Sequence, residues 1–250
     1  MVVFSLCYRV HEYASTNHLS NSSNTMKKIL FILVFSSLLI TSLSGQSDVS
    51  GQSNWYYTYG GEMLFSFADI DDNGQEVNSP MRWAPVINIQ GYANRNISEK
   101  FGVYAGLAVR NVGYINDDYT DPADQLDYKK KFRTYNLAIP LGIKVGNLSK
   151  LFFFGGYDIE FPFAYKEKTF TGGDKIEKIT GWFSDRYEGI QHGPHIGIQF
   201  PQGLDVKFKY YLTEFHNQDF TENTGVKPYA GLESHIFYFS LSWKMFDPWW

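Results

Sequence analysis

The sequence predicts an all-β fold, an eight-stranded antiparallel up-and-down transmembrane β-barrel, and three observations support it. Aromatic-rich segments recur, each long enough for a tilted membrane strand of about 9–11 residues. Within them apolar and polar residues alternate with period two, which indicates strands with one apolar face. Short connections and long connections between these segments alternate along the chain. The eight segments are Trp55–Ala68, Arg82–Asn94, Phe101–Asn116, Phe132–Gly146, Leu151–Lys166, Gly189–Phe200, Leu204–Phe215 and Gly231–Phe246.

An export signal is expected ahead of the strands. Met26-Lys27-Lys28 supplies a basic start, residues 29–40 are apolar, and small residues follow, which is the layout of a secretory signal peptide. We interpret residues 26–45 as this signal, with cleavage near Ser44 or Gly45, and residues 46–54 as a short lead-in. Residues 1–25 have no apolar period, and we interpret them as an upstream mis-start or a disordered extension.

Composition and charge exclude several classes of function. The chain is 18% aromatic and also 19% charged, with a net charge of −4, so its strands should have one apolar and one wet face. A mildly acidic chain without a large Lys/Arg cluster argues against nucleic acid as a partner. The single cysteine, Cys7, precedes the expected cleavage site. The mature chain would therefore contain no disulfide and no thiolate site, and no cofactor is expected.

Aromatic residues near the strand ends predict a girdle, and the third and fifth segments predict a narrow interior. Aromatic residues near strand ends suit the interfacial girdles of membrane barrels: Trp55, Tyr56, Tyr57, Tyr59, Trp243, Trp249 and Trp250. Small or polar residues share the other face of the third and fifth segments, where they would fill the interior: Gly102, Gly106, Ala108 and Arg110, then Gly156, Asp158 and Glu160. We expect these interior charges to pair with Lys144, Lys207 and Lys209 and to plug the barrel.

Alternation is clearest in the fourth, seventh and eighth segments. One face of the fourth segment carries Tyr135, Leu137, Ile139, Leu141, Ile143 and Val145, and the other face carries Thr134, Asn136, Ala138, Pro140, Gly142 and Lys144. The seventh sets Leu204, Val206, Phe208, Tyr210 and Leu212 against Asp205, Lys207, Lys209 and Tyr211. The eighth sets His235, Phe237, Phe239, Leu241, Trp243 and Met245 against Ser234, Ile236, Tyr238, Ser240, Ser242 and Lys244.

The links separate a membrane barrel from a soluble sandwich or a lipocalin-like barrel, whose strands also alternate. The short links are residues 95–100, 147–150 and 201–203, and the long polar ones are Asp69–Met81, Asp117–Lys131, Glu167–Glu188 and His216–Ala230. Outer-membrane barrels sort their links in this way, with tight periplasmic turns and longer outer loops. We therefore expect residues 55–246 to form the barrel, with both of its ends on the periplasmic side, and residues 247–250 to form a tail.

One hairpin carries a family resemblance. Tyr135–Gly146, with its Ile-Pro-Leu strand, is followed by Leu151–Gly156, an aromatic strand with paired glycines. The pair resembles the mid-barrel hairpin of the Bacteroidota-type outer-membrane β-barrel domain, the PorT-like group. The resemblance implies an outer-membrane barrel without catalytic residues to carry over. The last strand is similar to one that the barrel-assembly machinery recognises, although Asp247-Pro-Trp-Trp250 follows it.

Two candidate binding sites lie in the long links. Asp69, Asp71 and Asn73 match the first half of a calcium loop, but Pro80 stands where the loop needs a bidentate Glu; a solvated turn is the alternative. The basic run Lys129, Lys130 and Lys131, with Arg133, would lie within reach of lipopolysaccharide phosphates, and a solvated strand end is the alternative.

Histidines predict little chemistry. His192 and His195 fall on opposite faces of one segment, His216 opens a loop and His235 lies on an apolar face, so we expect surface or interfacial roles. Ser234 is the only serine next to a histidine of the mature chain, and adjacent strand residues point to opposite faces. We therefore predict no enzyme.

The predicted function is a non-enzymatic barrel of the bacterial outer membrane that acts as an envelope scaffold or through its outer loops. Three alternatives stay open: a narrow small-solute channel, a component of a secretion machine, and a lipid A-modifying barrel enzyme. The expected partners are outer-membrane lipid and lipopolysaccharide, the barrel-assembly machinery through the last strand, and an envelope protein that the sequence does not identify.

Overall fold

The structure is a computed structural model that describes residues 55–246. The predicted mis-start or extension of residues 1–25, the signal, the lead-in, the tail, and the girdle residues Trp249 and Trp250 lie outside the described residues. The strands are β1 (Trp55–Asp72), β2 (Gln75–Val77), β3 (Arg82–Ala84), β4 (Ile89–Asn96), β5 (Phe101–Thr120), β6 (Asp127–Gly146), β7 (Phe152–Thr171), β8 (Asp174–Trp182), β9 (Gln191–Gln199), β10 (Leu204–Tyr210) and β11 (Leu232–Phe246), with a short 3-10 turn at Pro201–Gly203.

Within residues 55–246 there is no helix with the length and apolar character needed to cross a membrane.

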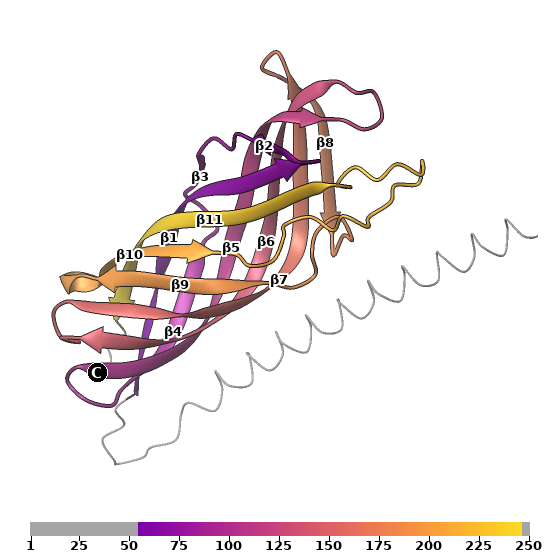
Figure 1. The fold of residues 1–250 in the computed structure, drawn as a ribbon. Helices are drawn as coiled ribbons and strands as arrows, with labels where there is room; N and C mark the ends of the chain where they lie inside the picture. Colours follow the sequence, from indigo (N-terminus) through magenta and orange to yellow (C-terminus); the bar gives the residue numbers. More distant parts are fainter. Residues whose placement is uncertain (1–54, 247–250) are drawn as a thin grey trace, which may run out of the picture. The chain divides into compact units, whose positions relative to one another are not determined.

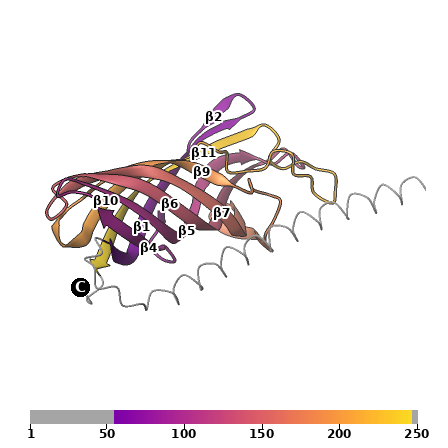
Figure 2. The same cartoon turned by 90° about the horizontal axis from the view of Figure 1, so that it is seen from below.

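Eight of the strands form a closed antiparallel ring (Figure 1, Figure 2). Around the ring, β1 is followed by β4, β5, β6, β7, β9, β10 and β11, each paired with the next. β11 then pairs with β1 in a register that runs from Thr58↔Phe246 to Asp72↔Leu232. Because the last strand pairs with the first, the ring has no open edge. The predicted eight-stranded, antiparallel, up-and-down barrel is confirmed.

Three of the predicted long loops are in part strand hairpins. β1 and β2 are joined at Asn73 and Gly74, with φ of 54° and 86°, and β7 and β8 at Gly172 and Gly173, with φ of 57° and 95°. Positive φ at both central residues is the tight hairpin turn that matches strand twist. β5 and β6 likewise extend until only residues 121–126 separate them. We call this the long-hairpin end and the opposite one the short-turn end.

The predicted strand Arg82–Asn94 is interrupted. Residues 85–88 separate β3 from β4 because Pro85 has no N–H to donate and Ile87 adopts a φ of 62°. Asn88 holds the break in place: its side chain donates to Ala84 O at 2.7 Å and accepts from Asn111 N at 2.7 Å. Similarly, β10 ends at Tyr210, earlier than the predicted Phe215.

An apolar belt covers the outside of the ring. On β6 the outward residues 135–145 are apolar, and Leu141, Ile143 and Val145 are 47–49% exposed, over the length that a tilted membrane strand needs. Other strands add Tyr57, Tyr59, Ile89, Phe153, Tyr157, Ile159, Ile196, Val206, Phe239, Leu241, Trp243 and Met245. One girdle prediction was wrong: Tyr56 faces the interior, where its hydroxyl accepts from Lys144 Nζ at 2.7 Å.

Candidate functional site

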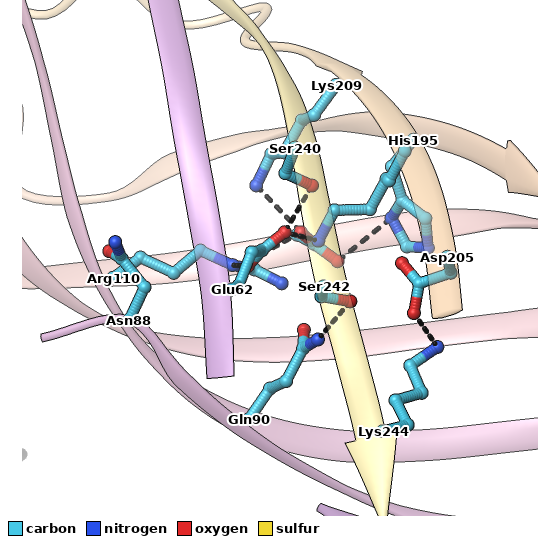
Figure 3. Close-up of polar contacts among 12 residues, drawn as sticks. Glu62, Asn88, Gln90, Arg110, His195, Asp205, Lys209, Ser240, Ser242 and Lys244 are labelled. Atoms are coloured by element: carbon cyan, nitrogen blue, oxygen red, sulfur yellow. Dashed lines mark hydrogen bonds and ion pairs between the residues drawn. The ribbon is translucent and has the colours of Figure 1, made fainter. Parts of the chain in front are cut away.

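Six charged side chains meet inside the ring, and Figure 3 labels three of them, Glu62, Arg110 and Lys209. They project from inward positions of β1, β5, β7 and β10 and are at most 4% exposed: Glu62, Asp158 and Glu160, with Arg110, Lys207 and Lys209. Three acids and three bases leave no formal charge in excess, as the burial of ions requires. We call these six residues the interior network.

Two bases hold the two acids of β7. Arg110 Nη1 lies 2.6 Å from Asp158 Oδ2 and 2.7 Å from Glu160 Oε1. Lys209 Nζ lies 2.9 Å and 2.5 Å from the same two oxygens. Charge-assisted hydrogen bonds of this length are among the strong ones in proteins. The prediction that these interior charges pair is therefore confirmed.

Glu62 completes the interior network, although the predicted interior charges do not include it. One of its oxygens is 2.5 Å from Lys207 Nζ and the other 3.3 Å from Arg110 Nε, and Ser240 Oγ donates to it at 2.6 Å. The sequence does contain a signal for it. A lone acid in an aromatic segment of membrane length is favourable only on the lumen side.

Lysines nearer the short-turn end are held separately. The expected pairing of Lys144 with an interior acid was wrong: among the described residues, Lys144 instead donates to Tyr56 and Asn96. Lys244 Nζ lies 3.0 Å from Asp205 Oδ2, and Figure 3 marks this ion pair with a dashed line. The interior is thus filled by polar contacts beyond the interior network itself.

His195 does not have the predicted surface or interfacial role, because it is 6% exposed and joins the interior. Its Nδ1 lies 3.0 Å from Asp158 Oδ1 and its Nε2 2.6 Å from the Tyr104 hydroxyl. An acid, an imidazole and a hydroxyl in line can transfer protons. The hydroxyl here is a phenol, and its ring packs edge-on against Tyr92 and Phe154. These contacts hold His195 and Tyr104 in place inside the ring.

His216 is also buried, contrary to its predicted place at the surface. It is 0% exposed, stacks on Tyr229 with ring centroids 4.1 Å apart and meets Phe132 edge-on at 4.5 Å. Its Nε2 lies 2.9 Å from the Tyr114 hydroxyl. Burial lowers the pKa of His216 to about 3, so the ring is neutral at pH 7. We call this group of aromatic residues around His216 the aromatic cap.

The four predicted lipopolysaccharide residues are divided between the two faces of β6. Lys130 points inward, is 4% exposed and pairs with Glu167 at 3.0 Å. Lys129, Lys131 and Arg133 lie on the outer wall, and Lys129 Nζ is 2.6 Å from Asp117 Oδ1. Binding of lipopolysaccharide by these residues stays a prediction, without Lys130.

The predicted calcium residues stand at the β1–β2 turn. Asp71 Oδ1 accepts from Gly74 N at 2.6 Å, and Asn73 donates to Asp72 at 2.8 Å. Asp69 lies on the outer face of β1, opposite His235 of β11. Between residues 55 and 246 no three His, Cys, Asp or Glu side chains gather as a metal site. Calcium binding here stays a prediction.

Neighbouring serine and histidine residues face opposite ways, as predicted. Ser234 is buried inside, and His235 stacks on Tyr210 of the outer wall. His192 likewise stacks on Tyr157 outside the ring, while His195 lies inside. No serine–histidine pair is formed at these positions.

No protein-family model matches the chain, and no curated protein matches it. Solved structures that align with it include a major outer membrane protein from Thermus thermophilus, with 10% identity and a TM-score of 0.38 over 76% of this chain and 99% of that chain. The outer membrane protein OprG from Pseudomonas aeruginosa aligns with 11% identity and a TM-score of 0.36, over 79% and 99%. Ail of Yersinia pestis, in complex with the heparin analogue sucrose octasulfate, aligns with 9% identity and a TM-score of 0.36, over 76% and 99%.

Proposed function

We propose that the mature chain is a non-enzymatic barrel of a bacterial outer membrane that acts as an envelope scaffold or through its outer loops. The contrast between the two faces of the ring carries this proposal. The outer face is an apolar belt of membrane length, and the inner face is filled by paired charges. A closed sheet with this contrast suits a bilayer, where every backbone polar group needs an internal partner.

The long-hairpin end is the outward end in this proposal. The hairpins β1–β2, β5–β6 and β7–β8 extend beyond the apolar belt, and the aromatic cap joins β5 and β6 to the segment between β10 and β11. The short turns and both ends of the barrel then lie on the periplasmic side, as in bacterial barrels generally. The outward end would then present these three hairpins to a partner.

A narrow channel is disfavoured by the interior network. A conducting path would have to separate Arg110 from Asp158 and Glu160, and leaving a buried ion unpaired costs about 3–5 kcal/mol. An eight-stranded ring is also only wide enough for its own side chains. The barrel is accordingly proposed to be sealed.

Finer assignments rest on the sequence. The Tyr135–Gly146 hairpin supports membership of the PorT-like group, and with it the alternative of a secretion-machine component. The aromatic last strand supports recognition by the barrel-assembly machinery. The basic start at Met26-Lys27-Lys28 and the apolar stretch of residues 29–40 support export through a cleaved signal peptide. A lipid A-modifying enzyme is the weakest alternative because Ser234 and His235 face opposite sides of β11.

Conductance in planar bilayers tests the sealed barrel. The refolded mature chain should give no steady current, and the double variant Arg110→Ala/Lys209→Ala should leak because it empties the centre of the interior network. Heat-modifiable gel mobility of each sample verifies that the barrel is folded. Steady current through the folded wild-type protein would favour the channel instead, and a protein that stays folded and monomeric without detergent would contradict the membrane location.

A further inference from the structure

A groove of about 400 Å³ opens on the outer wall, next to the apolar belt at the long-hairpin end. β3, residues 85–86, and parts of β5, β6 and β7 form it. Five cationic side chains line it: Arg82, Lys131, Arg133, Lys166 and Lys168. No acidic side chain is among the lining residues. We call it the basic groove.

The strand register brings these cations together. Lys131 pairs across the sheet with Lys168, and Arg133 with Lys166. Like charges directly opposite one another destabilise a sheet. Such pairs are therefore unfavourable unless a ligand supplies negative charge.

The cations of the basic groove also lack acidic partners. In the described part of the chain, none of the five has a carboxylate within 4.0 Å, whereas Lys129 has Asp117 and Lys130 has Glu167. Arg82 Nη2 donates to Asn111 Oδ1 at 2.5 Å, and the buried Nε of Arg133 has no acceptor. A guanidinium that lacks an acceptor at the wall of a cationic groove suits phosphate oxygens.

An apolar hollow of about 590 Å³ lies on the same wall, on the short-turn side of the groove. Both features use outward positions of β5 and β6: Asn111 and Arg133 line the groove, and Leu107 and Leu137 line the hollow. Four residues along a strand span roughly 13 Å, so the hollow lies deeper in the apolar belt. We call it the apolar hollow.

Glycines create this hollow. Gly60, Gly61 and Gly91 line it. A Cβ added to Gly61 would meet no atom nearer than 3.9 Å, and one added to Gly91 none nearer than 4.0 Å. Packing within the wall therefore does not require glycine at these two positions. Their effect is to leave space on a surface otherwise covered by large side chains.

We propose that this wall is a binding site for one phosphorylated membrane lipid, with its phosphates in the basic groove and an acyl chain in the apolar hollow. The proposal rests on the proposed membrane location, in which the groove lies at the level of the outer-leaflet headgroups. It narrows the expected lipopolysaccharide contact to a defined site and adds Arg82, Lys166 and Lys168. It removes Lys129, which is paired with Asp117, and Lys130, which faces the interior. The ligand class is a phosphorylated glycolipid of the outer leaflet.

The test measures lipid retention by native mass spectrometry of the full mature chain in mild detergent. The probes are bis-phosphorylated lipid A, the same lipid without its phosphates, and inorganic phosphate. The wild-type barrel should retain the phosphorylated lipid preferentially, and Lys166→Gln/Lys168→Gln should weaken retention by about tenfold or more, since two charge-assisted contacts are lost. Lys129→Gln is the matched control, because that lysine lies on the same wall outside the groove and is paired with Asp117.

A second pair of variants, one test and one control, examines the apolar hollow. Gly91→Leu should fill the hollow and reduce retention of the lipid while leaving the weak binding of inorganic phosphate unchanged. Gly155→Leu adds the same side chain to the outer wall of β7, where a Cβ would be 3.5 Å from the nearest atom, and should retain lipid like wild type.

Equal retention by the wild type and Lys166→Gln/Lys168→Gln would overturn the proposal, as would equal retention of the lipid with and without phosphates. A third outcome would also overturn the lipid assignment. In it, the protein binds inorganic phosphate as well as it binds the lipid, and the Gly91→Leu and Gly155→Leu variants bind phosphate equally. The groove would then be a site for anions in general. Heat-modifiable mobility is recorded for every variant. A folded barrel that fails to retain lipid therefore contradicts this inference and not the proposed sealed barrel.

Discussion

Arg110 is the side chain on which most of the interior network depends. It contacts all three acids, Glu62, Asp158 and Glu160, and is 0% exposed. Without it, Lys207 and Lys209 would face three carboxylates. A buried ion pair adds little net stability relative to apolar packing, but the loss of one partner is costly because the other charge remains.

Arg110→Met is expected to lower the free energy of unfolding by about 3–5 kcal/mol. The substitution keeps most of the side-chain volume and removes the charge, so that electrostatics rather than a cavity dominates the result. Denaturant unfolding in detergent micelles measures it. Lys129→Met, which breaks a pair whose side chains are 41% and 33% exposed, should cost less than about 1 kcal/mol. Equal stability of Arg110→Met and wild type would show that the network is not held by this charge.

His216 should make the outward end sensitive to acid. Burial, with Lys130 and Arg186 nearby, lowers its pKa from 6.5 to about 3, so the folded state binds fewer protons than the unfolded state between these values. Its stabilising contribution is complete above about pH 6.5 and is lost as the pH falls toward 3. At pH 5 the loss should be about 2 kcal/mol.

Amide hydrogen exchange of residues 211–232 at pH 7 and pH 5, corrected for intrinsic rates, measures this opening. His216→Phe keeps an aromatic ring in the cap and should remove the difference between the two pH values. If the difference between the two pH values persists in His216→Phe, another titratable group causes the acid sensitivity. The candidates are Glu167 and Asp121, the two carboxylates that pair with Lys130.

Among the strands of residues 55–246, β7 alone contributes charged side chains to both candidate sites. Its inward residues Asp158 and Glu160 belong to the interior network, and Lys166 and Lys168 line the basic groove. The strand changes face between them at a bulge. Asn136 of β6 pairs with Pro162 and Tyr135 with Ala164, so Phe163 is an extra residue on β7. One extra residue reverses the parity of all that follows.

The β7–β8 hairpin should be reachable from outside the cell. A protease site inserted between Gly172 and Gly173 is expected to be cleaved on intact cells, because that turn lies beyond the apolar belt on the proposed outward end. The same insertion within residues 147–150, at a short turn, should be cleaved only after the outer membrane is opened. The reverse pattern would invert the proposed orientation.

For the molecule as a whole, the bilayer should act as the solvent of the outer face. Ile139 lies midway along the outward apolar residues 135–145 of β6, so an arginine there is expected to cost roughly 2–4 kcal/mol, the range for a cation near the bilayer centre. Refolding into lipid vesicles, followed by denaturant titration, measures this cost. Ile176→Arg is the matched control: Ile176 is 57% exposed on β8, beyond the belt, and should cost almost nothing. Equal costs at the two positions would argue against a membrane around the belt.

Closure of the ring links distant parts of the chain. β1 meets β11 along fifteen paired positions, and Glu62 of β1 reaches Lys207 of β10 across the interior. The aromatic cap joins Tyr114 of β5 to His216 beyond β10. These contacts need the full ring, so the interior network and the cap form only when all eight strands are in place.

The number of strands, their antiparallel order and the face of most residues follow from local pattern, because a strand's side chains alternate strictly while its backbone stays regular. Arg110, Lys207 and Lys209 could therefore be placed inside from the sequence, and Ile139 and Leu141 outside.

The alternation in the sequence does not predict the face of a residue beyond a β-bulge. It also does not predict which distant side chains the closed ring brings into contact. Continuing the parity of Asp158 would place Lys166 inside, but the bulge at Phe163 turns it outward and turns Glu167 inward. Pro162 was the signal for it, since proline inside a sheet is found at edges and bulges. The partners of His195 and His216 depend in the same way on the register of the closed ring. Alternation specifies the face of a residue, and pairing specifies its neighbours, so the basic groove could be located only in the folded chain.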